Sequence, residues 1–155
     1  MIEVRPARPE EAEALTRLCL RSKAHWGYDA AFMERCAATL RVTPAMIEEG
    51  RVLVAASGGE AVGVASFAAI EPAGSFDLDL LFVEPSAIGM GVGRLLFAAV
   101  VEQLEARDAT RMTILADPYA APFYERLGAR RIGDAPSDAV PGRSLPLFEF
   151  RLAAR

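Results

Sequence analysis

Alternate glycines precede an apolar run of helical spacing in residues 88–97, IGMGVGRLLF. Glycine permits positive φ angles and lets a ligand approach the main chain, and free amides at the start of a helix attract phosphate. The spacing differs from the G-x-G-x-x-G fingerprint of dinucleotide-binding proteins, and no G-K-[ST] follows as it does in a P-loop. Taken alone, these glycines fit a tight strand-to-helix turn and a phosphate-binding turn equally well.

Two carboxylates lie two residues apart in residues 75–85, SFDLDLLFVEP. If this segment is a strand, Asp77 and Asp79 point to the same face, whereas Glu84 lies on the opposite alternation. Such a pair could attract a cationic amine or accept its proton. The alternative interpretation is that the two carboxylates are solvated residues at a strand edge and have no role in chemistry. We interpret Asp77 as a candidate substrate-binding residue and Asp79 as a candidate catalytic residue.

Residues 22–32, SKAHWGYDAAF, hold the only histidine, His25, and the only tryptophan, Trp26, close to Tyr28. Aromatic side chains with polar tips beside a glycine suit a lid over a substrate site. The alternative interpretation is that these side chains form a hydrophobic plug that joins two helices. We predict that these three residues line an acceptor pocket. Arg143, in a loop before the last expected strand, could reach the same pocket, but we interpret it as a solvated loop residue.

The composition is that of a globular chain of 155 residues with a formal net charge of -4. We expect no nucleic-acid partner, because an acidic chain lacks the basic surface that such binding needs. Cys19 and Cys36 are too few for a disulfide framework and lack the paired spacing of a metal site, so no metal is predicted. Charges near the N-terminus argue against a signal peptide, and no apolar stretch could span a bilayer. We therefore expect no membrane association and a cytoplasmic location.

Apolar periodicity and turn residues predict a chain of alternating strands and helices. Strands are expected at residues 2–7, 51–57, 61–70, 75–85, 110–116, 129–134 and 145–152, with a hairpin turn at Gly58-Gly59. Helices are expected at residues 8–23, 30–40, 43–50, 91–107 and 118–128, the third with Thr43 as N-cap and Pro44 as first residue. This order predicts a single α/β (α+β) domain over residues 1–155, with a mixed central sheet of about six to seven strands and helices on both faces.

Residues 81–97, LFVEPSAIGMGVGRLLF, resemble the signature of the GNAT superfamily of acyl-CoA-dependent N-acyltransferases. The family pattern is a strand, a proline, and then Arg or Gln followed by x-x-G-x-G or x-x-G-x-A at the start of a long helix. Here residues 81–85 match the strand and its proline, Gly91 and Gly93 match the two glycines, and Arg94 follows them. The resemblance implies a phosphate-binding turn and the mixed fold expected above.

Residues 117–133, DPYAAPFYERLGARRIG, resemble the second family signature, which is an Asn, an Ala three residues on, and then Phe-Tyr-x-x-x-Gly. The matching residues are Ala120, Phe123, Tyr124 and Gly128. The chain departs from the pattern at three positions, where Ile88 replaces Arg or Gln, Met90 replaces a residue that is often basic, and Asp117 replaces Asn. We therefore expect the pyrophosphate to bind almost wholly through main-chain amides, aided by Arg94, and Asp117 to cost affinity if it faces the anionic cofactor.

The resemblance implies acetyl-CoA as the acyl donor, with its pantetheine arm along the strand before the glycine turn, where two parallel strands splay apart. It favours Asp79 over Asp77 as the catalytic carboxylate, because Asp79 lies nearer that point. It also implies that Tyr124 donates a proton to the departing thiolate, and packing in the core is the alternative. The cofactor site that it assigns consists of Leu81, Phe82, Val83, Gly89, Met90, Gly91, Val92, Gly93, Arg94, Asp117, Ala120 and Phe123.

The function implied is an N-acetyltransferase that moves an acetyl group from acetyl-CoA to a primary amine of a small molecule. Direct attack in a ternary complex is favoured, because neither motif contains a covalent nucleophile. The alternative is a ligand-sensing or interaction module that has kept the fold and lost the chemistry, which Ile88 and Asp117 favour and Tyr124 opposes. Members of the family often form homodimers through edge or C-terminal strands, which here would be LFEFRL, residues 147–152.

Overall fold

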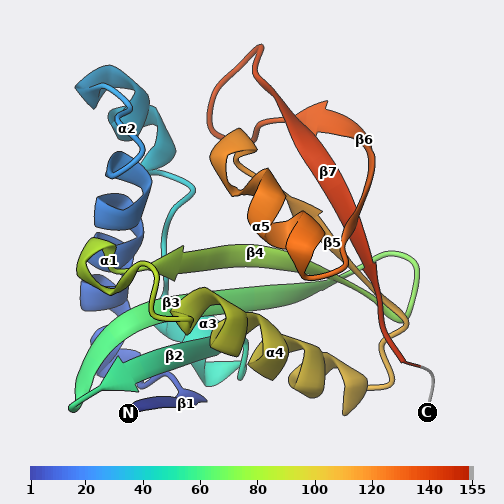
Figure 1. The fold of residues 1–155 in the computed structure, drawn as a ribbon, viewed down its shortest axis with the longest axis horizontal. Coiled ribbons are helices and arrows are strands. Elements are labelled where there is room, and N and C mark those ends of the chain that lie inside the picture. The colour runs from blue at the N-terminus through green and yellow to red at the C-terminus, as the bar shows by residue number, and fades with distance from the viewer. Residues whose placement is uncertain (154–155) are drawn as a thin grey trace.

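Seven strands form one mixed sheet in the computed structural model, which describes residues 1–153 (Figure 1). The order across the sheet is β1-β2-β3-β4-β5-β7-β6, and every neighbouring pair in this part of the chain is antiparallel except β4 and β5. The strands are β1 (Ile2–Pro6), β2 (Val52–Ser57), β3 (Glu60–Ile70), β4 (Ser75–Val83), β5 (Arg111–Leu115), β6 (Arg130–Pro136) and β7 (Ser144–Arg151).

The helices begin where capping residues and prolines predict them. Thr43 caps its helix by accepting a hydrogen bond from the Met46 amide, and Asp29 caps the preceding helix by accepting from Phe32. The helices are α1 (Ala12–Ala24), α2 (Ala30–Cys36), α3 (Pro44–Glu48), α4 (Val92–Glu105) and α5 (Ala121–Arg126), and 3-10 turns precede three of them at Pro9–Glu11, Pro85–Ala87 and Pro118–Ala120. No helix within residues 1–153 combines the length and the apolar character that a bilayer span requires.

Helices cover both faces of the sheet. On one face, α4 buries Val92 in a cluster that contains Phe67 of β3, and on the other face α1 buries Leu15 beside Val64. A Cβ atom on Gly63 of β3 would lie only 2.7 Å from the Val92 side chain. Glycine at this position therefore lets the start of α4 lie close against the sheet.

The parallel pair of β4 and β5 is short, and the two strands then diverge. Their pairing ends at Asp77, which lies opposite Thr113. Beyond this point β5 continues alongside β7, whereas β4 continues alongside β3 (Figure 1). The part of β4 after Asp77 is thus paired with β3 on one side and separated from β5 on the other.

A β-bulge at Asp79 lies on this separated part of β4. Ser66 of β3 is opposite Leu80 and its neighbour Phe67 is opposite Leu78, so Asp79 is the extra residue in β4. Bulges re-aim side chains locally and are frequent beside functional sites. Here the bulge changes the direction of β4 where it leaves β5.

The structure confirms the predicted order of strands and helices and the mixed sheet with helices on both faces. Residues 147–152, through which the resemblance implies a homodimer, do not form an edge strand. Strand β7 lies between β5 and β6, and both of its sides are already hydrogen-bonded. The edge strands of the sheet are β1 and β6.

Candidate active site

A cavity of about 1100 Å³ lies where β4 and β5 diverge. Its walls come from α1, β4, the turn before α4, the segment from β5 to α5, and the loop between β6 and β7. Every residue of β4 from Asp77 to Val83 lines it. The glycine turn, Tyr124 of the second signature and the two β4 carboxylates therefore all line one continuous cavity.

Nearly all of the predicted cofactor residues line this cavity. They are Leu81, Phe82, Val83, Gly89, Gly91, Val92, Gly93, Arg94, Asp117, Ala120 and Phe123. Met90 is the exception, because its side chain is 58% exposed and its amide donates to the Ala87 carbonyl at 3.2 Å. Its N–H group therefore helps to close the turn, and Met90 is not among the residues that line the cavity.

The glycine turn presents unpaired main-chain amides to the cavity. Gly89 and Gly91 have φ angles of +88° and +79°, which other residues adopt only with strain, and Gly91 is the residue before α4. Within residues 1–153, the amides of Gly89 and of residues 91–94 have no hydrogen-bond acceptor. Four of these amides belong to the N-terminal end of a 14-residue helix, whose dipole also favours a negative charge. The unpaired amides and the helix N-terminus therefore make this turn suitable for binding a phosphate group.

Arginine side chains also line the cavity, whereas Ile88 and Met90 of the turn are apolar. Arg94 follows the glycines, and Arg126 on α5 also lines the cavity. The sequence interpretation missed Arg126, although it lies two residues after Tyr124 in the second signature. Two arginines thus line the same cavity as the main-chain amides of the turn.

Gly93 has a packing role in addition to its place in the turn. A Cβ atom there would lie 3.1 Å from the ring of Phe123, and the Phe123 ring in turn packs edge-on against Tyr124 at 5.1 Å. The small residue lets α5 lie close to the start of α4, which fixes the position of Tyr124 beside the cavity.

Tyr124 is 6% exposed and lines the cavity. No group within residues 1–153 makes a hydrogen bond to its hydroxyl. Burial and the nearby charge of Asp77 raise the pKa of this phenol well above its ordinary value. The hydroxyl is therefore protonated at neutral pH and is available as a proton donor.

The two β4 carboxylates lie side by side and differ in their partners. Asp77 accepts a hydrogen bond from the Thr113 hydroxyl at 2.7 Å, at the last paired position of β4 and β5. Partial burial and the adjacent Asp77 carboxylate raise the pKa of Asp79 to about 7, and the Arg51 guanidinium, 3.9 Å from Asp79, opposes this shift. With its side chain 36% exposed, Asp79 can exchange a proton near neutral pH.

Asp117 is the centre of a network of side chains from distant segments. Its Oδ2 atom accepts hydrogen bonds from Lys23 Nζ at 2.5 Å and from the Tyr28 hydroxyl at 2.8 Å, and its Oδ1 atom accepts from the Tyr119 amide. Burial opposes ionisation of Asp117, but these donors hold its pKa below the ordinary value. The sequence predicts that Asp117 costs affinity if it faces the anionic cofactor, and in the structure the ion pair with Lys23 offsets its charge.

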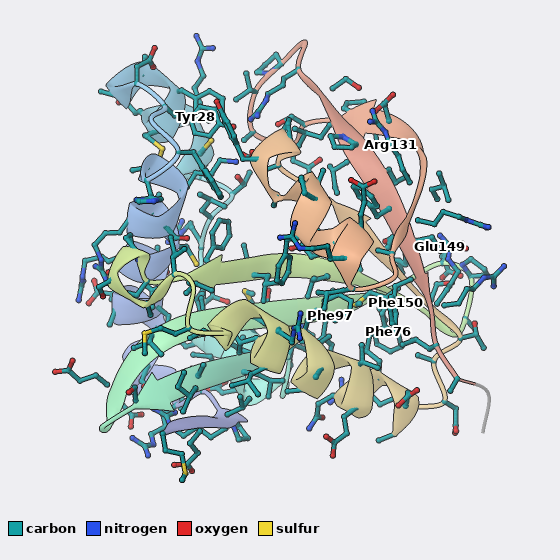
Figure 2. The ribbon with its side chains drawn as sticks, viewed as in Figure 1. Tyr28, Phe76, Phe97, Arg131, Glu149 and Phe150 are labelled. Atoms are coloured by element: carbon teal, nitrogen blue, oxygen red, sulfur yellow. The ribbon has the colours of Figure 1, made fainter. Side chains whose placement is uncertain are left out.

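Arg143 belongs to the same network, so its interpretation as a solvated loop residue is also wrong. Its Nη2 atom donates to the Tyr28 hydroxyl at 2.9 Å and lies 3.8 Å from Asp117. Its guanidinium lies over the rings of Tyr28 and Phe32, at 5.3 and 4.8 Å from their centroids. Figure 2 places Tyr28 on the side of α2 that faces α5 and the β6–β7 hairpin.

The predicted acceptor residues separate into two groups. Asp77 and Trp26 line the cavity, and Trp26 stacks on Tyr119 with ring centroids 5.1 Å apart. Tyr28 reaches the cavity wall indirectly, through its hydrogen bonds to Asp117 and Arg143. His25 is exposed and does not line the cavity, so the structure does not bring it into the cavity wall with Asp77 and Trp26. Its ring lies edge-on to that of Trp26, with the centroids 6.1 Å apart.

Lys23 is the other functional candidate that the sequence interpretation missed. It is 8% exposed and lies in α1, in the first part of the segment that holds the aromatic residues. A lysine inside an apolar helical face is a signal for a buried ion pair, but the sequence does not identify its partner. Within residues 1–153, no group of three or more His, Cys, Asp or Glu side chains is arranged to hold a metal ion.

Comparison with known proteins identifies the family. Residues 9–139 match the acetyltransferase (GNAT) domain. The PaiA N-acetyltransferase of Thermoplasma acidophilum, solved in complex with coenzyme A, has a similar fold, with a TM-score of 0.79 at 15% identity over 97% of this chain and 99% of that chain. A GCN5-related N-acetyltransferase structure from Rhodopseudomonas palustris gives a TM-score of 0.77 at 24% identity, over 97% of this chain and 95% of that chain.

One curated protein also matches over a short segment. It is the uncharacterized N-acetyltransferase ycf52 of Gracilaria tenuistipitata var. liui, 37% identical over 46 residues. The segment covers 30% of this chain and 25% of that protein, so the chain matches only a quarter of the relative's length. The domain match spans most of the chain, and the protein described here belongs to the GNAT acetyltransferase family.

Proposed function

We propose that the protein is an N-acetyltransferase that transfers the acetyl group of acetyl-CoA to a primary amine of a small molecule. The observation that supports this best is that residues with unpaired amides, a protonated phenol and a carboxylate of raised pKa all line one cavity. These are the groups that a phosphate-bearing donor, a leaving thiolate and an incoming ammonium group would need.

The donor would lie along β4 and end at the glycine turn. The amides of Gly89 and of residues 91–94 would hold the pyrophosphate, with Arg94 and Arg126 supplying positive charge. The pantetheine arm would follow the part of β4 that has separated from β5, where the main chain faces the cavity. This arrangement would place the thioester near Tyr124.

Asp79 and Tyr124 would manage the protons of the transfer. Asp79 would take the proton of the ammonium group, directly or through water, so that the neutral nitrogen can attack the acetyl carbonyl carbon. The C–N bond then forms and the C–S bond breaks, while Tyr124 donates its hydroxyl proton to the sulfur that leaves as a thiol. The nitrogen carries one proton too many once the C–N bond has formed, and it would return this proton to the Tyr124 phenolate, directly or through water. Asp79 would release its own proton to solvent, so that both residues end in their starting states.

The cysteines do not favour a covalent intermediate. Burial raises the pKa of the Cys36 thiol, which lines the cavity, and raises the pKa of Cys19, in the core beneath α1, to about 12. Neither thiol is a thiolate at neutral pH, and thiolates are the reactive form. Direct attack by the amine therefore remains the favoured route.

A module that has lost the chemistry is the second candidate. Ile88 still favours it, because a side chain that often helps to hold the cofactor is replaced by an exposed apolar one. The argument from Asp117 is weaker than the sequence suggests, since its charge is neutralised by Lys23.

Two measurements on the intact chain separate these functions. Calorimetric titration with acetyl-CoA up to millimolar concentration should give saturable binding, and thiol release should then appear with some members of a panel of primary amines. Binding without thiol release from any amine would support the module that has lost the chemistry. Absence of binding at millimolar acetyl-CoA would overturn the acetyltransferase proposal at its first step.

A further inference from the structure

We propose, on the basis of the function proposed above, that the amine acceptor also carries a carboxylate group, which Arg143 binds while the β4 carboxylates receive the ammonium group. The acceptor would then be an amino acid or a compound with the same two charged groups. Four observations carry this assignment: the charge around Asp117, the place of Arg143, the acidic groups opposite, and the loop that joins them.

The network around Asp117 contains more positive than negative charge. Lys23 and Arg143 are both cationic, and Asp117 is the one carboxylate within 4 Å of either of them among residues 1–153. Lys23 forms the close ion pair, with both side chains 11% exposed, whereas Arg143 lies 3.8 Å from the same oxygen. One positive charge is therefore left without a close counter-ion at the cavity wall, and a half-buried charge of this kind favours an anionic ligand.

Arg143 is held in place but has unused donors. Its side chain is 21% exposed, lies over two aromatic rings and lines the cavity. Its guanidinium group makes one hydrogen bond within residues 1–153, to Tyr28, although such a group carries five N–H donors in a planar fork. This fork matches both oxygens of a carboxylate. A carboxylate, with its single charge, also matches the single excess charge better than a phosphate does.

The opposite charge gathers at β4. Asp77 and Asp79 line the same cavity as Arg143, and so does Asp138 in the loop between β6 and β7. The charge of Asp138 acts on Asp79 and contributes to the rise of its pKa, so this loop lies within electrostatic range of β4. Together these carboxylates suit a positively charged amine.

The loop between β6 and β7 connects the two charged regions. Asp138 and Arg143 both belong to it, five residues apart, and both line the cavity. An acceptor that reaches Asp79 through its ammonium group thus has a cationic group on the same loop for its other end. A simple amine would leave the charge of Arg143 without a partner.

The test compares acceptors that differ only in the carboxylate. Thiol release from acetyl-CoA would be measured with a panel of amino acids, each against its own carboxamide, and then with Arg143→Gln and Arg143→Lys. For the best amino acid we expect kcat/KM at least about tenfold above that of its amide, which corresponds to one charge-assisted contact. Arg143→Gln should reduce this preference to about twofold or less, Arg143→Lys should retain part of it, and Arg130→Gln, an exposed arginine outside the cavity, should leave it unchanged.

The outcomes separate this inference from the proposed function. Amides that are acetylated as well as the amino acids, or a preference that survives Arg143→Gln, would overturn the carboxylate site and leave the acetyltransferase intact. No thiol release from any amine would overturn the proposed function and this inference with it. The affinity for acetyl-CoA, measured by titration for each variant, should stay within about twofold of the wild type, since Arg143 is placed at the acceptor.

Discussion

The two ends of the cavity are built in different ways. At the glycine turn, Gly89 and residues 91–94 offer main-chain amides that a local sequence pattern creates. At the end that we propose binds the acceptor, side chains from separate segments meet on Asp117, with Lys23 94 residues away and Arg143 bound to Tyr28 across 115 residues. The first end depends on backbone conformation, and the second depends on charges that only the tertiary fold brings together.

This difference has a functional meaning. A phosphate held by amides needs no particular side chain, so on our proposal the turn would tolerate Ile88 and Met90 where the family pattern has Arg or Gln and an often basic residue. A network of buried charges fixes a particular arrangement, and one missing partner leaves another charge unsatisfied. We therefore expect side-chain substitutions to be severe at the acceptor end and mild at the turn, where only the glycines matter.

The largest effect is expected at the centre of the network. Asp117→Ala leaves Lys23 buried without its counter-ion and should lower the free energy of unfolding by about 3 kcal/mol in urea titrations at pH 7. Because its folded-state pKa lies below the ordinary value, the loss should be complete at neutral pH and shrink as the pH falls below the usual range of aspartate. Asp134→Ala, which removes the exposed ion pair with Arg131, is the control and should cost less than about 0.5 kcal/mol. Equal losses for both variants would show that the network is not a buried one.

Loss of the phenol should act on the reaction and leave donor binding unchanged. Tyr124→Phe keeps the packing against Phe123 but removes the proton donor, so kcat should fall about 100-fold. The dissociation constant of acetyl-CoA should change by less than about twofold, because the hydroxyl is placed at the leaving sulfur. If Tyr124→Phe turns over at the wild-type rate, the hydroxyl is not the proton donor and Tyr124 serves only in core packing.

The glycine turn should respond to a change in backbone preference and ignore a change in side chain. Gly91→Val disfavours the φ of +79° and should weaken acetyl-CoA binding at least about tenfold, as measured by calorimetry. Ile88→Ala removes a side chain that is 49% exposed and should leave the affinity within about twofold. If Ile88→Ala is as harmful as Gly91→Val, the turn binds through side chains and the contrast between the two ends fails.

The smallest expected effect is on the pH profile of kcat/KM, which two substitutions near Asp79 should shift in opposite directions. With one acceptor, kcat/KM should rise through about pH 7 as Asp79 loses its proton. Asp77→Asn removes the adjacent carboxylate and should move this rise to lower pH, whereas Arg51→Gln removes the opposing cation and should move it to higher pH. Stopped assays over a pH series measure both, and shifts in the same direction would assign the rise to another group.

The sequence predicts the turn and the fold well, because both follow from local patterns. Thr43 before Pro44, the Gly58-Gly59 hairpin and the apolar face of α4 all act within a few residues, and the structure confirms each of them. The predicted cofactor-binding residues of β4 and of the turn after it also come from local patterns, because these two segments are continuous in the chain.

The acceptor end could be predicted only in part. The strand alternation predicts that Asp77 and Asp79 point to the same face, but the bulge at Asp79, which interrupts that alternation, has no signal in the segment itself. Asp117 before Pro118 does have the pattern of a capping residue, and it caps the 3-10 turn through the Tyr119 amide. Its partner Lys23 depends on a long-range approach of α1 to the end of β5, which no local spacing encodes.

Transfer of a labelled acetyl group tests the central claim most directly. Acetyl-CoA carrying an isotopic label in its acetyl group would be incubated with the protein and a panel of primary amines, and the products analysed by mass spectrometry. We predict that the label appears on the amine nitrogen of an acceptor in step with the release of free thiol, and that Tyr124→Phe slows both equally. Saturable binding of acetyl-CoA with no labelled amide from any amine would contradict the claim that this cavity is an acetyltransferase site.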